Sequence, residues 1–271
     1  MAGIGAIIFK IMIAIIVLLL FVIALIIGLS VAGNSTVNDV TTSNAVGQIG
    51  TNAILGCTFT PDPKQASNVL WEKDGMTGNV YKYENGKASL KDQNSQFTSR
   101  TALFLDQLTS GNASLKISNV QLADAGVYKC TITNSKGTGS NKLTLNVGAF
   151  SPLTLTNTSG STLQCSSSSW YPSPTVSWLN SNGTNINAST QIVSGLGVTV
   201  DVLSTFSGAV LEEQYTCIIQ NNLAKAQGSA KFTILGLKTD GRLDVTGSAA
   251  ILSPPVFLLW LLLLIGYTAA I

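Results

Sequence analysis

The chain has 271 residues, a net charge of +2 and no histidine. Its charges are balanced and form no long run of Lys or Arg, which excludes the basic footprint of a nucleic-acid-binding protein. The lack of histidine excludes Ser-His-Asp and Cys-His catalysis and every zinc site that uses histidine, so we expect no enzyme, no cofactor and no small-molecule substrate.

The N-terminal segment is almost uninterruptedly apolar from residue 4 to residue 29, with Lys10 as the interruption. A positive residue, an apolar stretch and then small residues are typical of a secretory signal peptide, which we place at residues 1–33. The apolar core exceeds the usual length of about 7–15 residues, so an uncleaved signal anchor stays open as an alternative. Both interpretations send the following residues out of the cell.

Residues 34–147 alternate apolar and polar side chains, as the strands of a half-solvated antiparallel sheet do. Cys57 is followed fourteen residues later by Trp71, and Tyr128 stands two positions before Cys130. A cysteine, a core tryptophan one strand later and a tyrosine two positions before the second cysteine are the marks of an immunoglobulin sandwich.

The 73-residue span between these cysteines leaves room for the extra strand pair of a variable-type domain. The segment Asn79–Tyr83 and the turn Glu84–Lys87 fit that hairpin. We expect Arg100 to meet Asp124 across the bottom of this sandwich, as a structural ion pair.

Residues 148–237 repeat the pattern, with Cys165, Trp178, Tyr215 and Cys217 in the corresponding places. The cysteines here are only 52 residues apart, which leaves no room for the extra hairpin and predicts a constant-type domain. The fold class is therefore all-β, with two tandem immunoglobulin sandwiches and apolar segments at both termini.

Each half of the chain holds its own cysteine pair around its own tryptophan, so we pair Cys57 with Cys130 and Cys165 with Cys217. Such bonds persist in an oxidising compartment, which places both domains outside the cell. In the loop-entropy model, the longer loop stabilises its domain by roughly 4 kcal/mol.

After the second domain we expect a short polar stalk at residues 238–250 and an apolar segment at residues 251–271. The last segment is long enough to span a bilayer. The small residues before it and the lack of a following basic cluster also fit the signal for a glycolipid anchor, so both attachments stay open. Both place the protein at the cell surface.

Five acceptor sequences for N-linked glycans occur in the chain, and their glycans would mark faces that cannot bind a partner. The five asparagines are Asn34, Asn112, Asn157, Asn182 and Asn187.

Several runs of residues carry a resemblance to a known family. They are Asp124–Cys130 in the first domain, Trp170–Trp178 in the second, and the shorter runs Gly111–Lys116, Asn119–Leu122, Ser135–Gly137, Val147–Phe150 and Ile23–Gly28. With them, the order of variable-type domain, constant-type domain and membrane attachment resembles the B7 and butyrophilin group of immune coregulatory ligands.

This resemblance implies a cell-surface ligand that dampens T-cell activation, proliferation and cytokine production through a receptor on the T cell. An adhesion molecule of the immunoglobulin superfamily is the alternative. In variable-type ligands, partners usually meet the sheet that contains the second cysteine and the core tryptophan. Strand alternation and the neighbouring segments give these candidates for the receptor-binding face: Leu70, Glu72, Tyr81, Tyr83, Lys129, Thr131, Thr133 and Lys136.

Overall fold

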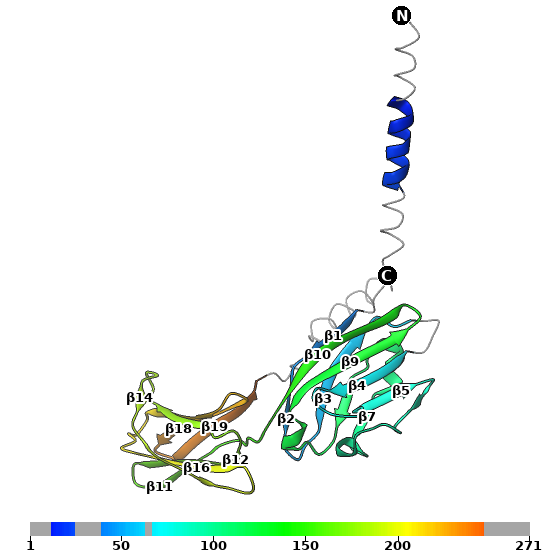
Figure 1. Cartoon of the computed structure of the whole chain (residues 1–271). Coiled ribbons are helices and arrows are strands. Elements are labelled where there is room, and N and C mark those ends of the chain that lie inside the picture. The colour runs from blue at the N-terminus through cyan, green and yellow to red at the C-terminus, as the bar shows by residue number, and fades with distance from the viewer. Residues whose placement is uncertain (1–11, 25–38, 63–66, 247–271) are drawn as a thin grey trace, which may run out of the picture.

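The computed structural model describes residues 12–24, 39–62 and 67–246 (Figure 1). Residues 12–24 form a helix, and the rest of the described chain folds into strands, turns and short 3-10 helices. Within these ranges, no helix is both long and apolar enough to cross a bilayer. Most of the predicted signal segment and the whole of residues 251–271 lie outside the described residues.

The first sandwich packs a four-stranded sheet against a six-stranded sheet. The smaller sheet has the order β1 (Val40–Ser43), β3 (Ala53–Phe59), β8 (Leu115–Ile117) and β7 (Thr101–Leu103). The larger sheet has the order β2 (Ala45–Gln48), β10 (Gly137–Gly148), β9 (Gly126–Asn134), β4 (Asn68–Lys73), β5 (Tyr81–Glu84) and β6 (Lys87–Ala88). Three 3-10 helices, η1 (Ser95–Phe97), η2 (Leu105–Ser110) and η3 (Leu122–Asp124), join the strands.

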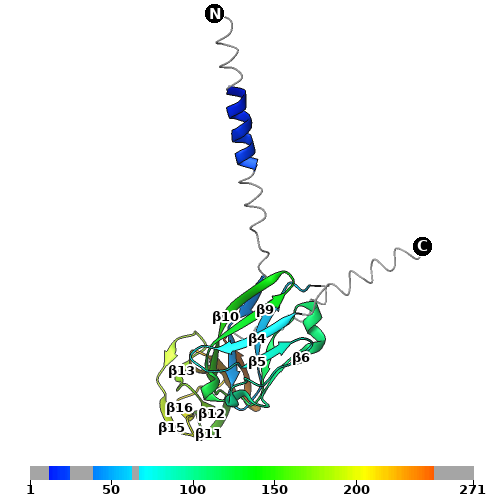
Figure 2. The same ribbon diagram turned by 45° about the vertical axis from the view of Figure 1, so that its right-hand side comes forward.

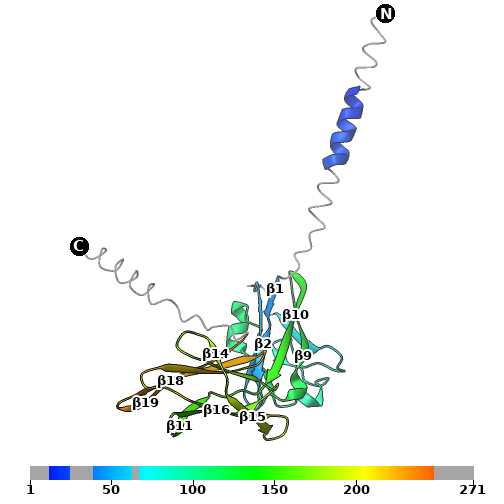
Figure 3. The ribbon, with the colours of Figure 1, turned by 90° about the vertical axis from the view of Figure 1, so that its left-hand side faces the viewer.

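The second sandwich packs a four-stranded sheet against a five-stranded sheet (Figure 3). The first of these has the order β11 (Thr154–Ser159), β12 (Thr162–Trp170), β16 (Val200–Ser207) and β15 (Ser189–Ser194). The second has the order β14 (Asn185–Ile186), β13 (Thr175–Leu179), β17 (Gln214–Gln220), β18 (Ala224–Thr233) and β19 (Gly236–Val245).

Both predicted disulfides are confirmed. Cys57 bonds to Cys130 and Cys165 to Cys217, each pair with its Cα atoms 6.5 Å apart. Trp71, fully buried, lies in the same core as the first pair and donates its indole N–H to the Ala113 carbonyl at 3.0 Å. Side chains of this size dominate the apolar burial that stabilises a small domain.

The extra hairpin predicted for the first domain is present as β5 and β6. Its turn residues, Asn85 and Gly86, both have positive φ angles, of 52° and 77°. Asparagine and glycine tolerate that conformation better than other residues, and it suits the twist of a two-residue hairpin.

Residues 238–245 do not form the predicted stalk. They belong to β19, which pairs antiparallel with β18 from Gly236 to Val245. The segment is polar like a stalk, but its charged residues recur with the period of two that is typical of a strand. Leu237, Leu243 and Val245 pack against the core, while the charged residues between them face solvent.

The two sandwiches meet at a hydrogen-bonded junction. Main-chain bonds link Ala149 and Tyr171 in both directions, at 3.0 and 2.8 Å. Gln48 donates its side-chain amide to the Phe150 carbonyl at 3.0 Å. Val46 packs against the hydrophobic core of the second sandwich. The first domain thus contributes a side chain to the packing of the second.

Candidate receptor-binding face

The larger sheet of the first domain presents a broad outer face, and Figure 2 shows its strands β10, β9, β4, β5 and β6 side by side. Strand β9 sets the alternation, because Tyr128, Cys130 and Ile132 are fully buried in the core. Lys129 and Thr131, between them, are half-buried. The same alternation leaves Thr133 exposed. In the described part of the chain, this side of the sheet faces away from the core.

Leu70 lies at the middle of this face. The register places Thr131 of β9 opposite Leu70 of β4 on one side and opposite Ser140 of β10 on the other. Lys82 of β5 is opposite Leu70 on the far side. The row across the sheet is therefore Ser140, Thr131, Leu70, Lys82, with one half-buried apolar side chain among polar ones.

Charges of both signs surround this row in balance. Lys82 forms an ion pair with Glu84 at 2.7 Å, and Glu72 lies opposite Lys129 in the ladder. A third pair joins Lys142 to Asp74 at 2.8 Å. Exposed pairs of this kind contribute about 0–1 kcal/mol to stability, so they are free to exchange partners on binding.

Two of the predicted face residues are wrong. Tyr81 is only 6% exposed and belongs to the core, because it lies opposite Trp71 in the β4–β5 pair. Tyr83 lies opposite the buried Val69 and packs against the same core. The outward positions of β5 are instead Lys82 and Glu84.

The signal that identifies Lys82 and Glu84 is present in the sequence. Directly opposed residues in an antiparallel pair point to the same face, so an inward tryptophan requires an inward partner. Tyrosine is common at interfaces, but the alternation of the strand places both tyrosines toward the core.

Lys136 lies at the rim of the face rather than on it. It is half-buried in the turn between β9 and β10, where its ammonium donates to the Pro61 carbonyl at 3.1 Å. The residue therefore ties this turn to the segment that follows β3.

The predicted ion pair between Arg100 and Asp124 is present at the base of the first sandwich. The guanidinium donates to both carboxylate oxygens at 2.8 Å, and Asp124 is fully buried. Gln96 and the Gln121 N–H also donate to this carboxylate. Burial raises the pKa of Asp124, but the hydrogen bonds outweigh it and hold the pKa below its ordinary value. Tyr128 donates its hydroxyl to the Asp124 carbonyl at 2.6 Å.

The second domain closes its corner without a buried charge. Tyr215, a predicted framework residue, accepts the Val210 N–H at 3.1 Å and donates to Glu213 at 3.2 Å. The predicted core residue Trp178 donates its indole N–H to the Ser204 hydroxyl at 2.9 Å.

The four acceptor asparagines that the structure describes lie away from the outer face of the first domain. Asn157, Asn182 and Asn187 are exposed on the second domain. Asn112 is half-buried beside β3, and its side chain bonds to Gln107 and to the Ser114 N–H. Asn34 lies outside the described residues. Occupancy of these sites stays a prediction.

Two family models match the chain, one for each sandwich. The immunoglobulin V-set domain matches residues 41–148. The Ig-C domain of the type described as butyrophilin subfamily 3 member A2-like matches residues 152–228. These matches establish a V-set domain followed by a C2-set domain.

The curated relatives include V-set domain-containing T-cell activation inhibitor 1 of Homo sapiens, which is 39% identical over 259 residues, 92% of each chain. The chain belongs to this family. The Mus musculus member is also 39% identical, over 95% of this chain and 93% of its own. Bovine butyrophilin matches with a TM-score of 0.50 at 19% identity, over 76% of this chain and 97% of that chain, and shows the fold alone.

Proposed function

We propose that the chain is a non-enzymatic, cell-surface ligand that restrains T-cell activation, proliferation and cytokine production. The relationship to proteins named as T-cell activation inhibitors along 92% of the chain supports this proposal. The ligand binds a receptor on the T cell through the outer face of strands β10, β9, β4 and β5.

The composition of this face supports its role. A protein interface needs a small apolar centre surrounded by polar groups that exclude water. Leu70 supplies the centre, while Thr131, Ser140 and Lys82 surround it. No acceptor asparagine lies on these four strands. Glycans on the four described acceptor sites would therefore be attached outside these strands.

Attachment to the membrane follows from the apolar segment at residues 251–271. A glycolipid anchor and a spanning helix are distinguished by phosphatidylinositol-specific phospholipase C, applied to cells that display the chain. Loss of the surface signal identifies the lipid anchor, and full retention, with a lipid-anchored control protein released, favours the helix. Both outcomes leave the ligand role intact.

Alanine scanning of the displayed chain tests the binding face. We expect Leu70→Ala and Thr131→Ala to weaken binding of activated T cells, while Tyr81→Ala reduces surface expression because Tyr81 packs in the core. Uniform tolerance to alanine across the outer face contradicts the assignment. Aggregation of beads coated with the chain, without T cells, supports the adhesion alternative instead.

A further inference from the structure

Strand β19 is the outermost strand of its sheet, and only β18 pairs with it among the described residues. An antiparallel edge strand leaves alternate N–H and C=O groups unpaired, which makes it a template for another strand. In the first domain the corresponding edge strand is β2, which has four residues and pairs in parallel with β10. Strand β19 has ten residues and therefore presents the longer edge of the two.

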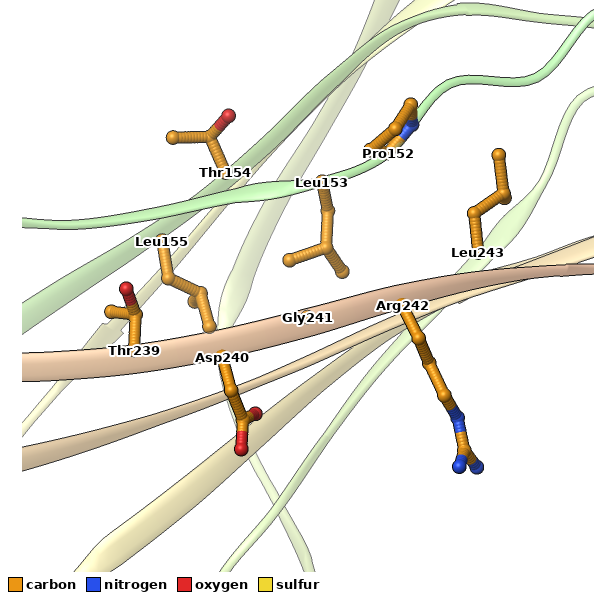
Figure 4. Close-up of a pocket in the computed structure, with 9 residues that line it drawn as sticks. All are labelled: Pro152, Leu153, Thr154, Leu155, Thr239, Asp240, Gly241, Arg242 and Leu243. Carbon is orange, nitrogen blue, oxygen red and sulfur yellow. The ribbon is translucent and has the colours of Figure 1, made fainter.

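The outward side chains of β19 carry charges of alternating sign. They are Lys238, Asp240, Arg242 and Asp244, all of them exposed. Figure 4 shows Asp240 and Arg242 pointing away from the leucines of the segment that leads into β11. The charges thus line the solvent side of the edge, in the order plus, minus, plus, minus.

This order is complementary to itself when read in reverse. In an antiparallel pair centred on Gly241, Lys238 lies opposite Asp244 of the second copy, and Asp240 lies opposite Arg242. Each pair occurs twice by symmetry. Opposite charges directly across a pair of strands are favourable, and like charges are unfavourable.

The registers centred one residue away, on residue 240 or 242, are disfavoured by the same charges. A pair centred on residue 240 places Lys238 opposite Arg242, and a pair centred on residue 242 places Asp240 opposite Asp244. Registers that are shifted by a single residue would place charged side chains on the face that continues the core. Pairs centred on residue 239 or 243 form one kind of opposite-charge pair, Lys238 with Asp240 or Arg242 with Asp244, whereas the pair centred on Gly241 forms two. The charges of β19 therefore favour the register centred on Gly241.

We propose that two copies of the chain pair antiparallel through β19, with the twofold axis at Gly241. The pairing joins two five-stranded sheets into one continuous sheet.

The space beside the edge is compatible with an added strand. A groove of about 420 Å³ lies between β11 and β19, lined on one side by Pro152–Leu155 and on the other by Thr239–Leu243 (Figure 4). In the proposed register, Leu243 of one copy lies opposite Thr239 of the other. The leucine would thereby add apolar surface beside this groove.

Cysteine cross-linking on cells that display the full chain tests the register. All four native cysteines are in disulfides, so Gly241→Cys introduces the one free thiol. The substitution fits, because the nearest atom to an added Cβ is the Gln227 carbonyl oxygen at 3.6 Å. Mild oxidation should give a disulfide-linked dimer, since the two central residues oppose each other within bonding reach.

Thr239→Cys is the matched control on the same strand. In the proposed register its two thiols are separated by four residue positions, or about 13 Å along the strand, which is too far for a disulfide. Equal cross-linking of the two variants, or none at residue 241 in a chain that reaches the surface, overturns the proposal.

Charge exchange tests the proposal independently of folding, because the altered side chains are exposed. In the Gly241→Cys background, Arg242→Asp should reduce dimer formation about tenfold, because it places like charges together twice. Adding Asp240→Arg should restore it. If the cysteine variant fails to reach the surface, co-precipitation of two differently tagged chains replaces cross-linking. Unchanged dimer formation in the single charge variant overturns the proposal.

Discussion

The two domains share a cystine and a buried tryptophan but secure them differently. In the V-set domain, Trp71 donates to a main-chain carbonyl and the base is closed by the buried Arg100–Asp124 pair. In the C2-set domain, Trp178 donates to the hydroxyl of Ser204, and Tyr215 closes the corner. The same immunoglobulin framework can therefore be closed with a buried charge or without one.

The two domains also differ in the length of one edge strand. Strand β2, beside β10 in the first domain, has four residues, whereas β19, beside β18 in the second, has ten. We propose that the first domain meets its partner through a sheet face and the second through a sheet edge.

The largest expected effect is on the shared core. Trp71→Ala should lower the free energy of unfolding by about 3–5 kcal/mol, because it leaves a cavity beside the cystine. Surface display at 37 °C should be lost, as measured with an antibody to the second domain. Ile54→Ala, at a residue that is 56% exposed, is the control and should be displayed normally.

The buried ion pair comes next. Arg100→Ala should cost the V-set domain about 3 kcal/mol, because Asp124 would be left buried without its cation. Chemical denaturation measures the loss. Lys142→Ala breaks an ion pair whose side chains are 55% and 49% exposed, and should cost under about 1 kcal/mol. Equal costs for the two variants would show that burial does not set the value of these pairs.

A smaller effect is expected in the second domain. Ser204→Ala removes the hydroxyl that accepts from Trp178 and should cost about 1–3 kcal/mol, because the buried indole N–H loses its partner. Thr190→Ala removes only the second hydrogen bond to this hydroxyl and should cost less. Thermal unfolding followed by tryptophan fluorescence measures the stability of the two variants. A larger loss in Thr190→Ala than in Ser204→Ala would contradict the role given to the Ser204 hydroxyl.

Acidification should destabilise the V-set domain more than the C2-set domain. The folded-state pKa of Asp124 is below its ordinary value, because the bonds from Arg100, Gln121 and Gln96 outweigh the effect of burial. The stabilisation is complete above the unfolded pKa of about 4 and is lost as the pH falls through the folded pKa. Calorimetry below about pH 4 should show the V-set transition falling faster than the C2-set transition. In Asp124→Asn this difference should disappear.

Much of the framework could be predicted from the sequence, because cystine spacing and strand alternation are local. The disulfide pairing and the Arg100–Asp124 pair are found as expected. The errors at Tyr81 and Tyr83 came from ranking residue type above register. Strand β19 could not be distinguished from a linker by composition, because an edge strand rich in charge is as polar as a linker.

Leu70 gives the most direct test of the proposed function. Cells displaying the chain should suppress proliferation of co-cultured activated T cells, and Leu70→Lys should abolish the suppression at equal surface density. Ile54→Lys, exposed on the opposite sheet, is the matched control and should suppress like the unaltered chain. Full suppression by Leu70→Lys, or none by the unaltered chain, would contradict the account.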